Sequence, residues 1–467
     1  MSLKILLINV SLRPEAKVRL FPVGLGYIAT AMKNAGYAFD LIDIDGHRLS
    51  QQQVENNLKK KKYDVVCMGC IVTGYKIIKS LSQTVRQYQP GAKIIAGNSV
   101  ATSIVQTLLS RTDVDIAVMG EGDETIIELL RAIDKDTPLE AVRGICFTRN
   151  GQIARNEPRP YIKDISSMPL LDFSIFDIEV YIENSKNSVS DPLPILREKI
   201  RALPVNTARG CISHCTFCYH NFLGLPYRYR SAKSIVAEIK HSLETYRLNY
   251  IHFWDELTFY SKKQTLELVQ EILDQNLKFY WAATCRANLF DDKKDMEIIY
   301  KMKEAGCLGM AYSLESANPR ILKAMNKHIT TAQFTKQTRL FHKAGLPTWT
   351  SLVFGYPQET PATIKATFDC CIKNKMYPSA GYLLPQPGSV MYDYALRHGF
   401  IDDEEEYLEK LGDRQDLRLN ITGMPDLKFE SLITQGLKRC NEKLKLGLKQ
   451  KELIKSQYYR AQKKGNS

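Results

Sequence analysis

The stretch ARGCISHCTFCYH, residues 208–220, contains three cysteines in the spacing C-x3-C-x2-C. It follows a candidate strand at residues 203–208, so Cys211, Cys215 and Cys218 fall in one loop at a strand end. Three thiolates this close in sequence can hold three corners of a cubane iron–sulfur cluster, which four cysteines normally bind. The spacing therefore predicts a cluster whose fourth iron is open to a substrate or cofactor.

Two other interpretations of the three cysteines stay open. A structural zinc site would need a fourth ligand, which His214 or His220 could supply. Structural zinc sites usually close with four ligands in paired C-x2–4-C units, so the spacing favours the iron–sulfur cluster. The remaining alternative is three unrelated core cysteines, which the spacing favours least.

Strand–helix alternation continues from the cysteine loop to about residue 400. Six repeated steps of this kind predict an open or partial (β/α)6 barrel over residues 203–400, rather than a second doubly wound sheet. Residues 401–467 look helical and end in a basic tail. The expected barrel strands are Leu203–Ala208, Tyr250–Trp254, Tyr280–Ala283, Leu308–Leu314, Thr348–Phe354 and Ala380–Leu384.

Short apolar runs also alternate with helical patterns over residues 1–135. This α/β pattern predicts a doubly wound, Rossmann-like domain with a parallel sheet, which binds ligands beyond the carboxyl ends of its strands. Prolines recur over residues 136–202 and periodicity is weak, so we expect a connector there. The expected strands of the first domain are Lys4–Val10, Ala38–Ile44, Val65–Gly69, Lys93–Ala96 and Asp115–Val118.

The composition is that of an ordinary globular protein, with 467 residues, 44% hydrophobic and 25% charged. No apolar run is long enough to span a membrane, and the start lacks a signal-peptide pattern, so we expect a cytoplasmic protein with reduced cysteines. Of the net charge of +13, the tail from Lys438 to Ser467 carries more than half, with ten basic and two acidic residues. We expect a solvated helix there and no nucleic-acid partner; a membrane-surface contact is the less favoured alternative.

The cysteine loop resembles the signature C-x3-C-x-aromatic-C of the radical S-adenosylmethionine (SAM) superfamily, with Phe217 as the aromatic residue. The resemblance covers residues 205–400. It implies that the three cysteines bind a 4Fe-4S cluster, that SAM chelates the open iron, and that reductive cleavage gives a 5′-deoxyadenosyl radical. Further cofactor-binding candidates follow the barrel strands: Asp255 or Glu256, Arg286, Glu315, Ser316 and Gly355.

The first domain resembles the cobalamin-binding domain of one radical SAM subclass, through residues 21–29, 41–43 and the run Gly-Glu-Gly-Asp-Glu-Thr at 120–125. Asn98 stands where that family usually has a second glycine, and asparagine tolerates a positive φ. His47 lies in a motif near D-x-H-x-x-G but after the second strand, so we expect a surface histidine and no histidine below cobalt. The cobalamin candidates are Gly69, Cys70, Thr73, Gly97, Asn98, Ser99, Gly120, Glu121 and Gly122.

The resemblance implies a cobalamin-dependent radical SAM enzyme that methylates an unactivated carbon of a small-molecule, natural-product or lipid substrate. It also implies an external one-electron donor such as flavodoxin or ferredoxin. Two alternatives stay open: a non-methylating cyclisation, oxidation or rearrangement, as in the anaerobic porphyrin cyclase relatives, and a non-catalytic sensor. Similar doubly wound domains also bind flavin, nucleotides or nothing, although no G-x-G-x-x-G follows the first strand.

Overall fold

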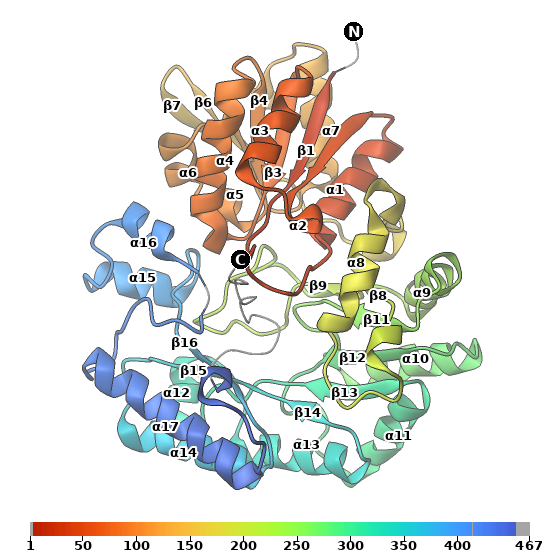
Figure 1. Ribbon diagram of the computed structural model, residues 1–467, viewed down its shortest axis with the longest axis vertical. Coiled ribbons are helices and arrows are strands. Elements are labelled where there is room, and N and C mark those ends of the chain that lie inside the picture. Colours follow the sequence, from red (N-terminus) through yellow and green to blue (C-terminus); the bar gives the residue numbers. More distant parts are fainter. Residues whose placement is uncertain (1–2, 413, 454–467) are drawn as a thin grey trace, which may run out of the picture.

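The computed structural model describes residues 3–412 and 414–453. Figure 1 shows two lobes, with the sheet of the first lobe above the barrel strands of the second. The last part of the basic tail, residues 454–467, lies outside the described residues. Among the described helices, none is both long and apolar enough to cross a membrane.

The first lobe is built on a sheet in the order β2-β1-β3-β4-β5-β6-β7. Its first five strands are parallel, as the sequence predicted. Strand residues alternate between two apolar cores, because Ile5 and Leu7 face one layer of helices while Leu6 and Ile8 face the other. The strands are β1 Ile5–Asn9, β2 Phe39–Asp43, β3 Val65–Gly69, β4 Lys93–Gly97 and β5 Ile116–Val118.

The helices of this lobe cover both faces of the sheet, which confirms the doubly wound prediction. The helical segment after β4 is divided near Ile104 into α5 and α6. The helices are α1 Val23–Asn34, α2 Ile44–His47, α3 Gln51–Lys60, α4 Tyr75–Tyr88, α5 Ser99–Ser103, α6 Val105–Arg111 and α7 Gly122–Asp134.

Part of the expected connector belongs to the sheet instead. Strands β6 (Ile145–Arg149) and β7 (Gln152–Arg155) form an antiparallel hairpin that extends the sheet beyond β5. The turn is Asn150-Gly151, and both residues have positive φ, 50° and 75°. An Asn-Gly pair is the strongest local signal for such a hairpin, so the sequence did contain the evidence that the prediction missed.

The second lobe contains the expected partial barrel. Strands β14-β13-β12-β11-β8 form one parallel sheet, and β15 and β16 pair in parallel beyond it. The strands are β8 Ala202–Val205, β11 Tyr250–Phe253, β12 Tyr280–Thr284, β13 Cys307–Ala311, β14 Thr348–Trp349, β15 Ser351–Phe354 and β16 Ser379–Tyr382. The helices between them are α9 Ala232–Tyr246, α10 Lys262–Asp274, α11 Met296–Glu304, α12 Pro319–Ala324, α13 Thr331–Lys343 and α14 Pro361–Lys373.

The connector holds the lobes together through α8 (Ile178–Asn184). The Tyr181 hydroxyl is buried and donates to the Asp43 carboxylate at the end of β2, at 2.9 Å. Asn9 donates to the same carboxylate at 2.7 Å. The connector is therefore fixed to the carboxyl ends of β1 and β2.

The C-terminal helices return to both lobes. Helix α17 (Asp426–Leu444) packs on α14, where Gly436 lies against the ring of Phe368. Helix α15 (Val390–Arg397) leads into α16 (Glu404–Lys410), which packs on α4 of the first lobe (Figure 1). Lys79 of α4 donates to Glu405 at 2.7 Å, and Leu408 joins the core of the first lobe.

Candidate active site

A cavity of about 570 Å³ lies between the two lobes. Its floor is formed by the carboxyl ends of β3, β4 and β5, and its opposite wall by the loop that carries the three cysteines and by the end of β11. Ligands of open α/β sheets bind at such strand ends. Eight of the nine residues predicted for cobalamin line the cavity: Gly69, Thr73, Gly97, Asn98, Ser99, Gly120, Glu121 and Gly122.

The glycines of the floor leave room for a ligand. A Cβ atom built on Gly97 or Gly120 would meet no atom within 4 Å, so any side chain there would enter open space. Gly69 is required for another reason, because its Cβ would lie 2.7 Å from the carbonyl oxygen of Gly97. A flat ligand can therefore approach the backbone of the strand ends closely.

The cavity also extends below the floor, between the sheet and two helices. Ile95 and Val118 of the sheet face Ile28 of α1 and Ile126 of α7 along this cleft. The combination of an open glycine floor and an apolar cleft fits a corrin ring with a tail that descends between strand and helix.

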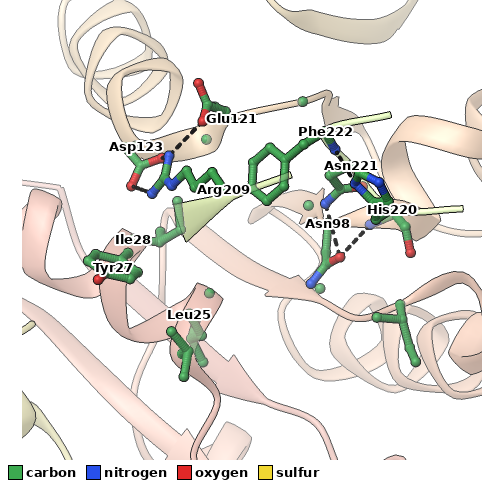
Figure 2. Close-up of a pocket in the computed structure, with 18 of the residues that line it drawn as sticks. Leu25, Tyr27, Ile28, Asn98, Glu121, Asp123, Arg209, His220, Asn221 and Phe222 are labelled. Carbon is green, nitrogen blue, oxygen red and sulfur yellow. Dashed lines mark hydrogen bonds and ion pairs between the residues drawn. The ribbon is translucent and has the colours of Figure 1, made fainter. Parts of the chain in front are cut away.

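Asn98 adopts the conformation that the missing second glycine would have provided. Its φ is 71°, and its side chain accepts a hydrogen bond from the Ser99 backbone at 2.6 Å. Asn221 of the cysteine loop donates to the same oxygen at 3.1 Å (Figure 2). The Ser99 hydroxyl accepts from the Val72 backbone at 2.8 Å. The turn predicted from the tolerance of asparagine is thus present, and it also contacts the other lobe.

Cys70 is the predicted cobalamin residue that does not line the main cavity. It lines a neighbouring cavity of about 260 Å³ together with Leu12 and Ile71. Cys67 lines the cleft, and burial raises its pKa to about 12. Burial also raises the pKa of Cys70. Both are buried thiols that pack in the apolar cores of the sheet.

The cysteine loop leaves and rejoins the barrel through a two-stranded ribbon, β9 (Ala208–Arg209) and β10 (Arg228–Tyr229). The loop between these two strands carries three half-buried cysteines, Cys211, Cys215 and Cys218. Thr216 anchors the loop to α12, since its backbone donates to the Met325 carbonyl at 3.0 Å. The three thiols are thereby held at the mouth of the barrel.

The thiols influence one another. Burial, together with the neighbouring Cys215 and Cys211, raises the pKa of Cys218 to about 12. Coordination to a metal removes such a proton. Among the described residues, no three His, Cys, Asp or Glu side chains converge as ligands of a single ion would. The spacing of the three cysteines is the observation that favours the cluster over zinc.

The two acidic residues after β11 have different surroundings. The Asp255 carboxylate accepts from the backbones of Thr207 and Ala208 at 2.8 and 3.1 Å, and burial raises its pKa to about 7. Asp255 thus fixes the start of β9. Glu256 lines the cavity, and burial raises its pKa as well. Of the two, Glu256 is the acid that can face a ligand.

The candidates after β12 and β13 lie close to the cysteine loop. Arg286 donates to the Ser213 hydroxyl at 2.8 Å. Glu315 has a φ of 62° and is buried, and it pairs with Lys327 at 3.0 Å. Its second carboxylate oxygen has no hydrogen-bond partner among the described residues. A buried residue with unusual backbone geometry and an unsatisfied oxygen is typical of a functional site.

The remaining barrel candidates have structural contacts. The Ser316 hydroxyl accepts from the Asn318 backbone at 3.1 Å, at the start of α12. Gly355 has a φ of 122°, and a Cβ there would lie 3.3 Å from Leu383, so only glycine fits this turn. Phe217 packs partly buried against the apolar cluster that contains Met391. These three residues shape the mouth of the barrel.

Several residues of the cavity wall were not predicted. Trp254 stacks on the buried His252, with ring centroids 5.0 Å apart, and stands directly before the two acids. Figure 2 shows Arg209 directed toward Glu121 and Asp123 across the lobes. Glu121 lines the cavity, yet its carboxylate is occupied by this pairing. The unpredicted wall residues of the second lobe include Arg209, Tyr219, His220, Asn221, Phe222, Trp254 and Gln386.

His47 does not line the cavity. It ends α2, its side chain is 41% exposed, and its nearest carboxylate is Asp177, at 4.0 Å. This placement matches the expectation of a surface histidine. Among the described residues that line the cavity, the histidine is His220 of the cysteine loop.

Comparison with known proteins identifies both lobes. Residues 205–371 match the family model of the radical SAM superfamily, and residues 12–130 match that of the B12 binding domain. An uncharacterized methyltransferase of Pyrococcus horikoshii is 25% identical over 386 residues, which cover 81% of this chain and 79% of that protein.

Two further proteins share most of this arrangement. The anaerobic magnesium-protoporphyrin IX monomethyl ester cyclase of Cereibacter sphaeroides is 26% identical over 354 residues, 74% of this chain and 55% of the cyclase. This chain thus spans about half the length of that relative. The radical SAM methyltransferase TsrM of Kitasatospora setae, solved with cobalamin and a [4Fe-4S] cluster bound, has the same fold. Its TM-score is 0.70 at 18% identity, over 86% of this chain and 79% of that one. The chain therefore belongs to the radical SAM enzymes that carry a cobalamin-binding domain, and its cofactors are a 4Fe-4S cluster, SAM and cobalamin.

Proposed function

We propose that this protein is a cobalamin-dependent methyltransferase that places a methyl group on an unactivated carbon of a small molecule. The observation that carries the proposal is the cavity of about 570 Å³, which the glycine floor and the cysteine-loop wall enclose together. A substrate in this cavity would lie between the two cofactor sites. The methyltransferase of Pyrococcus horikoshii, similar over 81% of this chain, supports the same reaction class.

The roles of individual residues follow from their positions. Cys211, Cys215 and Cys218 would bind the cluster. Glu256 would hold the SAM amino group, because a buried carboxylate in the cavity wall can accept charge-assisted hydrogen bonds from an ammonium. Arg286 would orient a carboxylate beside the cysteine loop, since it already donates to Ser213 there. The bound cofactors would supply a radical that abstracts a hydrogen atom from the substrate. They would also supply the methyl group that is transferred.

The glycine floor would seat the corrin. Gly97 and Gly120 leave open space above the strand ends, while Ser99 and Thr73 line the same floor. Trp254 and Phe222 would give the substrate an apolar wall and keep water from the reacting atoms. We infer further that an external flavodoxin or ferredoxin supplies the electron.

An anaerobic assay with SAM, cobalamin and a chemical reductant tests the proposal. A methyltransferase forms S-adenosylhomocysteine together with 5′-deoxyadenosine, and absorbance with metal and corrin analysis should show both prosthetic groups. Replacing Cys211, Cys215 and Cys218 by Ala should abolish SAM cleavage. Cys370→Ala is the control, because this half-buried cysteine lies on α14, outside the cysteine loop.

Two outcomes would point to other functions. The similarity to the porphyrin cyclase favours a non-methylating radical reaction as the second candidate, which would give 5′-deoxyadenosine without S-adenosylhomocysteine. A sensor would bind the cofactors and form neither product. Cleavage that survives in the triple cysteine variant would refute the cluster assignment.

A further inference from the structure

Glu121 occupies a position that its sequence motif alone does not explain. Its side chain is only 5% exposed, although it lies between two glycines of the cavity floor. One carboxylate oxygen accepts from Nη1 of Arg209 and from Nη1 of Arg228, both at 2.8 Å. The other accepts from the Ile162 backbone at 2.7 Å and from Arg228 at 2.9 Å. Both oxygens therefore have protein donors and are not free for a ligand.

The two arginines form the neck of the cysteine loop. Arg209 and Arg228 are register partners across the β9–β10 ribbon, and residues 210–227 between them carry all three cluster cysteines. Arg209 stands two residues before Cys211. The point that fixes these arginines therefore also fixes where the loop begins and ends.

Asp123 gives Arg209 a second attachment to the same lobe. Its two oxygens accept from Nη1 and Nη2 of Arg209, each at 3.0 Å, which is the paired geometry of guanidinium and carboxylate. Phe222 of the cysteine loop lies beside both guanidinium groups, with the ring centroid 5.8 Å from Arg209 and 5.5 Å from Arg228. The charges are thus shielded from solvent between the lobes.

Stability alone does not account for this network. A buried ion pair costs desolvation and is often no better than apolar packing, whereas it does define one geometry. Nε and Nη2 of the buried Arg228 have no hydrogen-bond partner among the described residues, so this charge relies on Glu121. Gly120 and Gly122 on either side of Glu121 belong to the floor of the cavity.

We propose that Glu121 and Asp123 are positioning residues, which hold the cysteine loop at a set place above the corrin floor. Through Arg209 and Arg228 they would determine how the cluster lies relative to cobalamin. The Asn98–Asn221 hydrogen bond gives the tip of the loop a second contact with the floor. The part that concerns the two cofactors rests on the proposed function.

The test compares Glu121→Gln and Asp123→Asn with Glu124→Gln in the full chain. Glu124 is the control because it lies on α7, directly after Asp123, but its side chain is 62% exposed. Hydrogen–deuterium exchange of the cofactor-free protein should become about tenfold faster over residues 208–229 in Glu121→Gln, as expected for loss of charge-assisted hydrogen bonds. Asp123→Asn should give a smaller increase, and Glu124→Gln none.

A second measurement uses protein loaded with the cluster and cobalamin. The magnetic interaction between cob(II)alamin and the reduced cluster, seen by electron paramagnetic resonance, depends on their separation. In Glu121→Gln the spectrum should show a broader distribution of this interaction than in the control. Cluster content and cobalamin affinity should stay within about twofold of the control, a smaller change than the loss of one net hydrogen bond would cause.

Two results would overturn the inference. One is unchanged exchange and unchanged magnetic interaction in both variants. The other is unchanged exchange with cobalamin affinity lowered about tenfold, which would make Glu121 a ligand contact. If Glu121→Gln does not fold, Asp123→Asn decides the question. If the wild-type protein takes up no cobalamin, the proposed function fails, and the exchange experiment still tests the positioning role.

Discussion

Gly97→Val should weaken cobalamin binding without harming the fold. The Cβ of residue 97 would meet no atom within 4 Å and would enter the cavity, and Gly97 has no positive φ that would strain a side chain. Valine is also favoured at the end of a strand. Replacing glycine at a compatible site stabilises a protein by about 0.4–1 kcal/mol, so the cofactor-free protein should unfold at the same temperature or slightly higher.

The effect on binding follows from overpacking. A side chain forced against a well-fitted ligand costs about 1–3 kcal/mol, which raises the dissociation constant of cobalamin about 5- to 150-fold. Titration of the corrin absorbance measures this constant, and thermal unfolding of the cofactor-free protein measures the fold. Gly91→Val is the matched control, because Gly91 is exposed before the same strand and also has open space around it.

The reasoning would be refuted by either of two results. In the first, Gly97→Val binds cobalamin as tightly as Gly91→Val. In the second, it lowers the unfolding temperature of the cofactor-free protein clearly more than the control. The first would mean that the corrin does not lie above the glycine floor.

Three further predictions concern other parts of the molecule. Glu256→Gln should weaken SAM binding about 10- to 150-fold in equilibrium titration, through loss of a charge-assisted hydrogen bond, whereas Asp255→Asn should mainly lower thermal stability; the reverse pattern would exchange their roles. Burial lowers the pKa of His252 to about 3, so between pH 6.5 and 3 the unfolded chain gains a proton that the folded chain does not. Going from pH 7.5 to 5.5 should therefore cost about 1.4 kcal/mol of stability through this residue, and His252→Gln should remove that part of the pH dependence in denaturant unfolding; an identical dependence in the variant would contradict it. Gly436→Ala should destabilise the protein by about 1–3 kcal/mol, since its Cβ would lie 2.1 Å from the Phe368 ring, while Gly423→Ala, with nothing within 4 Å, should be neutral; equal unfolding temperatures would argue against this packing of α17.

The sequence was most informative where one local pattern determines one element. The parallel strands of both lobes were predicted because apolar runs and helical periods alternate, and Asn98 was predicted to keep its turn because asparagine tolerates a positive φ. The hairpin at Asn150-Gly151 was missed although its signal is local, because the surrounding prolines favoured a connector.

Contacts between distant residues could not be predicted in this way. Glu121 and Arg209 are 88 positions apart, and nothing near either residue indicates that they pair. The motif around Glu121 predicted a ligand contact. In the structure its carboxylate is buried and forms ion pairs with Arg209 and Arg228 instead. Likewise, only the fold separates Asp255, which accepts from the backbone of β9, from Glu256 beside it in the cavity. The cavity wall of the second lobe became visible only once the two lobes were placed together.

The return of α16 to the first lobe has a consequence for synthesis on the ribosome. Leu408 and Tyr407 belong to the same apolar core as Leu6 and Ile8, yet they are translated roughly 250 residues after the sheet is complete. At about 5–20 residues per second, the nascent first lobe waits on the order of tens of seconds with part of its α4 surface uncovered. During that interval the chain depends on whatever shields exposed apolar surface in the cell, and a fragment that stops after the sheet keeps this exposure permanently.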